Sequence, residues 1–217
     1  LDEALGILKK NGISAVLGTP TAVMPAWAAN KYPEAMATDV HGRRVTWGVR
    51  KDMCFTNADY RRLSRQITRA MAEHFKKTPN VIGWQTDNEL GSGVLGCTCG
   101  SCRSAFQGWL KERHKTIDRF NAAMGTHFWG QKYGAWEEIF IPVDYERYNP
   151  SLCLEWDRFV SWLTVQFQSE QVKILREVCP KHFVTHNFMG LFSKLNYYDL
   201  AEELDFAGLD SYPVGEG

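Results

Sequence analysis

Hydrophobic and polar positions along this chain follow a repeating order, in which an amphipathic helix precedes a short apolar strand. Residues 1–11 place Leu5 and Leu8 on one helical face, Gly12 provides a turn, and residues 13–17 (ISAVL) then form an apolar run. Runs of this length and composition are typical of buried strands. Three more strands are expected at residues 81–84, 183–186 and 206–209, each after a predicted helix.

The two longest predicted helices carry clear signals at their starts. Asn57 and Asn149 stand where N-cap residues are expected, and Pro150 follows at the first helical position. Helical spacing predicts the buried face of the first helix from Tyr60, Leu63, Ile67, Met71 and Phe75. In the second helix, the same spacing selects Leu152, Trp156, Phe159, Leu163 and Phe167. Shorter helices are expected around residues 105–110, 116–124 and 198–203.

Each predicted strand ends in polar residues, which is typical of α/β folds whose functional face lies at the carboxyl ends of parallel strands. No glycine-rich nucleotide-binding motif is present. A full eight-stranded barrel takes about 250 residues, whereas here only four units are visible and long irregular segments separate them. We therefore predict an α/β fold, the central part of a single (β/α)8 (TIM) barrel domain spanning residues 1–217 and truncated at both ends.

Charge and hydropathy exclude several classes of partner. The 25 basic and 25 acidic residues cancel, which argues against nucleic acid or an anionic membrane as the main partner. No apolar run reaches the eighteen residues or so that are needed to span a bilayer. The chain shows no signal peptide and does not begin with Met. We expect a cytoplasmic protein whose true N-terminus is missing.

Aromatic residues make up 13% of the chain, and most of them are expected in the core. Some could instead stack on sugar rings in a cleft, because Trp combines a flat apolar face with a polar group.

The strand at residues 81–84 leads into Asp87, Asn88 and Glu89, where the most pointed chemical signal of the chain lies. A barrel glycosidase needs a carboxylic acid at such a strand end to protonate the glycosidic oxygen. The neighbouring Asn88 amide could bind a sugar hydroxyl. The alternative is a loop glutamate that only forms a salt bridge.

Three cysteines follow closely as Cys97, Cys99 and Cys102, and tetrahedral zinc requires four ligands. Cys54 lies in a loop before the helix that leads into the same strand, so it could supply the fourth thiolate. Zinc held by these four cysteines is the preferred interpretation, and disulfides or free thiols are the alternative. A site of four thiolates has no open position and would be structural. Cys153 and Cys179, on or near the long helix, are expected to be buried small hydrophobic residues.

Four further residues are weaker candidates. His127 and His186 could be ligands or sugar contacts, although a lone histidine is more often structural. Asp210 ends the last strand and could contact a substrate or hold a loop. Arg50 could bind a substrate hydroxyl, although a solvated loop arginine is the commoner case.

Taken together, these motifs resemble glycoside hydrolase family 42, the β-galactosidases, over nearly the whole chain. The segment LGTPTAVMPAWAANKYPE resembles the third barrel strand and its loop, GRRVTWGVRKDMC resembles the loop with arginine and cysteine, and GWQTDNE resembles the fourth strand. THNFMG is similar to the fifth strand and DSYP to the sixth. The chain would thus comprise roughly strands three to six of the barrel.

The resemblance implies a retaining hydrolase acting on terminal β-D-galactosyl groups, with Glu89 as the acid/base. It further implies that Asn88 and Arg50 contact the galactose and that Trp129 is an aromatic residue near the substrate. The zinc ligands of the family correspond to Cys54, Cys97, Cys99 and Cys102. Trimeric assembly is also common in the family, so a homotrimer is expected for the full-length protein.

The chain departs from the family pattern by ending before the strand that carries the nucleophilic glutamate. A retaining enzyme needs two carboxyl groups about 5 Å apart, so the chain alone is expected to be an inactive fragment with unpaired sheet edges. Two rival functions are considered. The protein could be a non-catalytic zinc-stabilised carbohydrate-binding or interaction module, or a related barrel glycosidase with a different sugar preference.

Overall fold

A parallel sheet of four strands forms the centre of the chain. The computed structural model describes residues 1–91, 96–190 and 192–212, so Pro213 of the DSYP motif lies outside it. The strands pair in the order β1-β2-β3-β4, and every pair is parallel. Their bounds are Ala15–Gly18 for β1, Val81–Gln85 for β2, Phe183–Phe188 for β3 and Phe206–Leu209 for β4.

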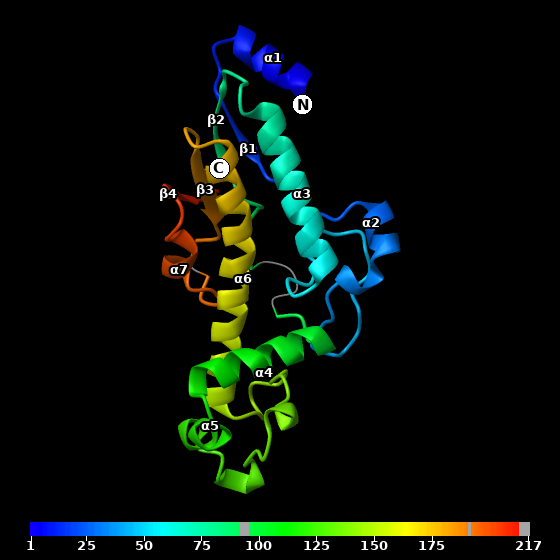
Figure 1. Ribbon diagram of the computed structural model, residues 1–217, viewed down its shortest axis with the longest axis vertical. Helices are drawn as coiled ribbons and strands as arrows, with labels where there is room; N and C mark the ends of the chain where they lie inside the picture. The colour runs from blue at the N-terminus through cyan, green and yellow to red at the C-terminus, as the bar shows by residue number, and fades with distance from the viewer. Residues whose placement is uncertain (92–95, 191, 213–217) are drawn as a thin grey trace, which may run out of the picture.

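Helices connect the strands and give the sequential order of a (β/α)8 barrel segment, which confirms the predicted fold class. The α-helices are α1 (Asp2–Lys10), α2 (Ala26–Lys31), α3 (Ala58–Phe75), α4 (Gly100–His114), α5 (Ile117–Met124), α6 (Pro150–Val178) and α7 (Tyr197–Ala201). Three short 3-10 helices are η1 (Pro33–Ala35), η2 (Phe128–Gly130) and η3 (Trp136–Glu138). Figure 1 shows α3 and α6 side by side along the sheet, with α4 lying across the lower end of α6 and α5 below α4. None of the helices in the described ranges is long and apolar enough to cross a membrane.

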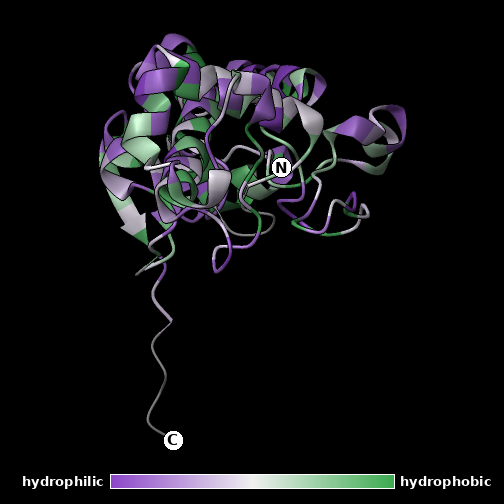
Figure 2. Cartoon of the chain, turned by 90° about the horizontal axis from the view of Figure 1, so that it is seen from below, coloured by the Kyte–Doolittle hydropathy of each residue, from purple (hydrophilic) through white to green (hydrophobic). Residues whose placement is uncertain are grey.

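The core lies between one face of the sheet and helices α3 and α6. Trp84 of β2 is fully buried there, together with Ala72 of α3 and Leu175 of α6. On the sheet's other side Val16 and Ile82 remain 45% and 44% exposed. Figure 2 shows the helices gathered on one side, with hydrophilic and hydrophobic stretches alternating along them. The apolar interior face of the sheet is therefore uncovered, as expected for an open part of a barrel.

The predicted helix starts are confirmed by side-chain caps. The Asn57 side chain accepts a hydrogen bond from the Tyr60 amide, and Asn149 accepts from Ser151 and Leu152. All five residues predicted for the buried face of α6 are at most 8% exposed. The caps at Asn57 and Asn149 satisfy amide groups that the first turn of a helix leaves without partners.

The predicted buried face of α3 is partly wrong. Tyr60 and Phe75 are buried as predicted, but Ile67 is 41% exposed and Leu63 and Met71 are only partly buried. The other buried positions of α3 are Ser64, Thr68 and Ala72. Small residues at a spacing of four allow α3 to approach α6 closely. The larger Leu63 and Ile67 consequently lie on the adjacent face, where they line an apolar hollow with Trp27 of α2.

The strand predicted at residues 13–17 begins two residues later in the structure. The Ile13 amide donates to the Leu8 carbonyl at the end of α1, and the Ile13 side chain is half exposed. The backbone of Ile13 thus completes the helix end instead of joining the sheet.

The long segment between β1 and α3 is folded back on itself. Besides α2 and η1, it contains antiparallel bridges between Met36 and Met53 and between Thr38 and Arg44. The amide of Lys51 also donates to the Ala22 carbonyl at 2.7 Å. These contacts bring residues 50–54 back toward the carboxyl ends of the strands.

Candidate functional site

The turn after β2 has an uncommon backbone conformation. Asp87 and Glu89 have φ angles of 46° and 42°, in the left-handed region that non-glycine residues rarely adopt. Each such residue costs on the order of 1 kcal/mol or more and persists only where surrounding contacts hold it. Contacts from the neighbouring strands must therefore hold this turn in place.

The end of β1 holds Asp87 in place. The Asp87 amide donates to the Thr19 hydroxyl at 2.6 Å, and the Asp87 carboxylate accepts from the Thr21 hydroxyl. The Tyr60 hydroxyl in turn donates to the Thr21 carbonyl at 2.8 Å. Burial raises the pKa of Asp87 above its usual value. Asp87 is thus a buried anchor that joins two strand ends.

His186 of β3 supports the turn from the other side. Its ring is buried, with Nδ1 2.7 Å from the Thr86 carbonyl oxygen and Nε2 3.0 Å from the Leu90 amide nitrogen. Because the Leu90 amide is a donor, Nε2 must accept, and the single proton of a neutral ring resides on Nδ1. Burial lowers the pKa of His186 to about 4, which agrees with the neutral form. The structure gives this histidine a structural role.

One asparagine side chain, that of Asn187, connects the ends of three strands. Its Oδ1 accepts from the Glu89 amide at 3.0 Å, and its Nδ2 donates to Asn88 Oδ1 at 3.0 Å. The same Nδ2 group lies 3.0 Å from Asp210 Oδ2, just beyond β4. The sequence placed Asp210 at a strand end, and the structure joins it through Asn187 to the Asn88–Glu89 pair.

The Glu89 carboxylate lies at the centre of a polar cluster. Its Oε2 atom is 3.0 Å from Lys51 Nζ, 3.4 Å from Arg50 Nη2 and 3.2 Å from Asn88 Nδ2. The hydrogen bond from Lys51 is the main cause that lowers the pKa of Glu89. The structure thus brings together Glu89, Asn88 and Arg50, three of the residues singled out from the sequence.

Lys51 is the residue of this cluster that sequence reasoning missed. Its only sequence signal was its place beside Arg50 in a segment that the resemblance selected. The backbone of Lys51 has a φ of 69°, and this unusual conformation turns its side chain toward Glu89.

Trp129 is not joined to this cluster. It lies on η2, the residue is 85% exposed, and its aromatic contact is a stack on Phe128. Within the described residues, no hydrogen bond or ring contact links Trp129 to Glu89.

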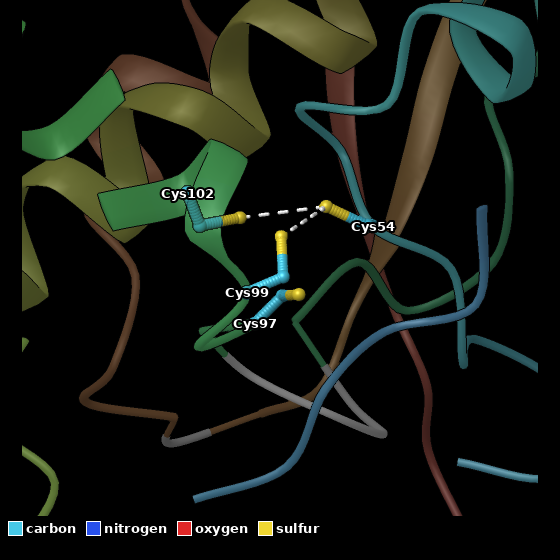
Figure 3. A group of neighbouring side chains, drawn as sticks. All are labelled: Cys54, Cys97, Cys99 and Cys102. Carbon is cyan, nitrogen blue, oxygen red and sulfur yellow. Dashed lines mark hydrogen bonds between the residues drawn. The ribbon is translucent and has the colours of Figure 1, made fainter. Parts of the chain in front are cut away.

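The four predicted metal ligands converge at one point. The Sγ atoms of Cys54, Cys97, Cys99 and Cys102 all lie within 4.8 Å of one another. Figure 3 shows Cys54 approaching from the loop before α3, opposite the other three at the start of α4. Cys54 Sγ is 3.4 Å from Cys102 Sγ and 3.7 Å from Cys99 Sγ. A tetrahedral zinc–thiolate centre with 2.3 Å bonds has sulfur atoms about 3.8 Å apart, so these residues fit such a group.

The chemistry around the sulfur atoms also suits a metal centre. All six cysteines are free thiols in the structure, so the disulfide alternative finds no support here. The Thr38 amide donates to Cys97 Sγ at 3.2 Å. Hydrogen bonds from the Cys102 and Cys54 thiols lower the pKa of Cys97 to about 7. The four cysteines could therefore hold a metal ion, whereas Cys153 and Cys179 are buried in apolar surroundings as predicted.

Comparisons with known proteins agree with this arrangement. The glycoside hydrolase family 42 profile, described as beta-galactosidase, matches residues 1–217. Beta-galactosidase BgaA of Thermus sp is 45% identical, covering 99% of this chain and 34% of the relative. Beta-galactosidase Bga of Halorubrum lacusprofundi is 41% identical, covering 99% of this chain and 31% of the relative.

Solved structures give the same result. A beta-galactosidase from Halorubrum lacusprofundi superposes with a TM-score of 0.93 at 40% identity, covering 98% of this chain and 32% of its own. The beta-galactosidase from the psychrophilic Marinomonas ef1 superposes with a TM-score of 0.92 at 36% identity, covering 98% of this chain and 33% of its own. The chain thus spans about a third of the length of the relatives it matches. It belongs to glycoside hydrolase family 42, the beta-galactosidase family.

Proposed function

We propose that this chain is the central part of a single (β/α)8 catalytic domain and that the full-length protein is a retaining β-galactosidase. The observation that carries the proposal is the Glu89 carboxyl group at the carboxyl end of β2. Its side chain is 15% exposed, and Arg50 and Asn88 donate to the same carboxylate oxygen. A carboxyl group held at a strand end among polar donors is suited to act on a bound sugar.

In the proposed mechanism Glu89 acts first as an acid and then as a base. It first donates the proton to the glycosidic oxygen while the bond from that oxygen to C1 breaks and a nucleophilic carboxylate bonds to C1. The Glu89 carboxylate then takes a proton from water while the water oxygen bonds to C1 and the nucleophile departs. The nucleophile belongs to a strand outside this chain. Arg50 and Asn88 are proposed to bind galactose hydroxyls, and Trp129 is a proposed sugar contact on the family resemblance alone.

The experiment that tests this role is Glu89→Gln in the full-length protein. Turnover of galactosides with poor leaving groups should fall by 10²-fold or more, because the amide cannot donate the proton. For galactosides with activated leaving groups, the rate of the first step should fall less, because such leaving groups need less protonation. Glu112→Gln makes the same change at an exposed position of α4 and should leave turnover unchanged.

Chemical rescue distinguishes the acid/base role from a structural one. Azide should restore turnover of an activated galactoside by Glu89→Ala and give a β-galactosyl azide, because azide attacks the glycosyl-enzyme without general base assistance. Unchanged turnover in Glu89→Gln would rule out the assignment. Comparing nitrophenyl galactoside with the glucoside, arabinoside and fucoside tests the sugar specificity.

We further propose that Cys54, Cys97, Cys99 and Cys102 bind one structural zinc ion. Their mutual distances and the closed set of four sulfur ligands support this proposal. Elemental analysis should find one zinc per chain and less in Cys99→Ser, whereas a metal-free protein with a Cys97–Cys102 disulfide would refute it. The family resemblance also implies a homotrimer, which light scattering of the full-length protein would test.

A further inference from the structure

The Lys51 ammonium group makes two contacts with Glu89. Nζ lies 3.0 Å from the carboxylate oxygen Oε2 and 3.3 Å from the Glu89 carbonyl oxygen. One side chain thus contacts both the backbone and the carboxyl group of the residue. Since Glu89 has a left-handed backbone, a donor to its carbonyl oxygen helps to hold that conformation.

The surroundings of Lys51 are those of a fixed group. Its side chain is only 7% exposed, whereas the Arg50 side chain is 60% exposed. The Lys51 backbone is held by the hydrogen bond to the Ala22 carbonyl, and its left-handed φ aims the side chain inward. Arg50 is therefore placed to reach a ligand in solvent, whereas Lys51 is placed to act on Glu89.

We propose that Lys51 is a positioning residue for the acid/base Glu89, fixing its carboxyl group through paired contacts with Oε2 and the backbone carbonyl. This inference rests on the proposed function of Glu89. The ammonium group stabilises the carboxylate that forms when Glu89 gives its proton to the leaving oxygen. It also keeps the resulting base oriented for the water molecule of the second step.

The charges around Glu89 show why a fixed cation matters there. Arg50 and Lys51 face it from the loop before α3, and Asp87 precedes it in its own turn. Among the residues that the structure describes, its titratable neighbours also include Asp210 after β4, the neutral His186 of β3 and Tyr197 of α7. In the active enzyme the nucleophilic carboxylate adds a further negative charge about 5 Å away, which disfavours ionisation of Glu89. Lys51 opposes that effect, in line with the lowered pKa of Glu89.

The test is the pH profile of kcat/KM for Lys51→Met in the full-length protein. The alkaline limb of this profile reports the loss of the Glu89 proton. Without the ammonium group its midpoint should move to higher pH by about one unit, because an opposite charge at this distance shifts a carboxyl pKa by that order. The turnover number should fall several-fold at the original optimum. Lys51→Arg retains the charge, so the midpoint of its alkaline limb should lie close to that of the wild type. Lys181→Met, an exposed change before β3, is the matched control and should change neither quantity.

The outcomes separate this inference from the function on which it rests. If Glu89→Gln is inactive on poor leaving groups and Lys51→Met keeps both limb and turnover, the role of Lys51 is refuted while that of Glu89 stands. A fall in thermal stability of Lys51→Met without a shifted limb also refutes it, because Lys51 then acts only in folding. If Glu89→Gln keeps full turnover, the proposed function itself fails.

Discussion

His186 is the buried residue whose protonation would disturb the Glu89 turn most directly. A proton on Nε2 would remove the acceptor that the Leu90 amide uses. The folded-state pKa of about 4 lies below the unfolded value of about 6.5, so the unfolded chain binds more protons between these pH values. The stability contribution is therefore complete above pH 6.5 and is lost as the pH falls toward 4. Its size is on the order of 3 kcal/mol.

This prediction is checked by measuring the free energy of unfolding against pH for the wild type and for His186→Gln. The variant loses the hydrogen bonds of the His186 ring, so its free energy of unfolding should be lower at neutral pH. Because it also lacks the titrating group, its free energy of unfolding should fall less between pH 6.5 and 4. Equal pH slopes for the two proteins would show that His186 does not titrate in this way.

At the scale of single residues, the sequence predicted positions at strand ends and missed contacts made by loops. The position of Asn88 and Glu89 at the end of a strand could be predicted because they follow an apolar run. The contact of Lys51 with Glu89 joins positions 38 residues apart in the chain. It depends on a loop path fixed by backbone hydrogen bonds, which no local pattern encodes.

At the scale of elements, apolar spacing located the helices and strands, and side-chain caps fixed several of their ends. It failed for the middle of the buried face of α3, because close packing against α6 selects the small residues Ser64, Thr68 and Ala72 there, and size rather than hydropathy determines the contact. Spacing also placed β1 two residues early, since Ile13 completes the turn of α1.

Gly83 illustrates how tightly β2 and β3 fit together. A Cβ atom added at Gly83 would overlap the ring of Phe183, its partner in the adjacent strand. Gly83→Ala must therefore displace that ring and should destabilise the protein by about 1–3 kcal/mol. The measurement is the thermal midpoint of the full-length protein.

Gly108 supplies the opposite case as a control. It lies exposed in α4, and an added Cβ would have no heavy atom within 4 Å apart from its chain neighbours and the backbone of its own helix. Gly108→Ala should raise the thermal midpoint, since alanine favours a helix by about 1 kcal/mol over glycine. A midpoint for Gly83→Ala as high as that of the wild type would contradict the packing argument.

For the whole molecule, the four cysteines connect parts of the chain that the sheet does not hold together. Cys54 belongs to the loop that carries Arg50 and Lys51, whereas Cys97, Cys99 and Cys102 belong to the segment that follows Glu89 (Figure 3). The same two segments are joined by the hydrogen bond from the Thr98 amide to the Thr38 carbonyl at 2.9 Å. A metal ion at the cysteines would therefore fix the loop whose cations contact Glu89.

Metal removal should then weaken both stability and catalysis in the full-length protein. A ligand present at 1,000 times its Kd stabilises the folded state by about 4 kcal/mol, so chelation should lower the thermal midpoint by several degrees. The freed loop should also reproduce part of the Lys51→Met pH profile, because Lys51 is only three residues from Cys54. Cys99→Ser should behave like the chelated protein, whereas Cys153→Ala removes a buried thiol outside the cluster and should retain the metal and the pH profile. If chelation lowers the midpoint but leaves the alkaline limb unchanged, the metal site stabilises the fold without positioning Lys51.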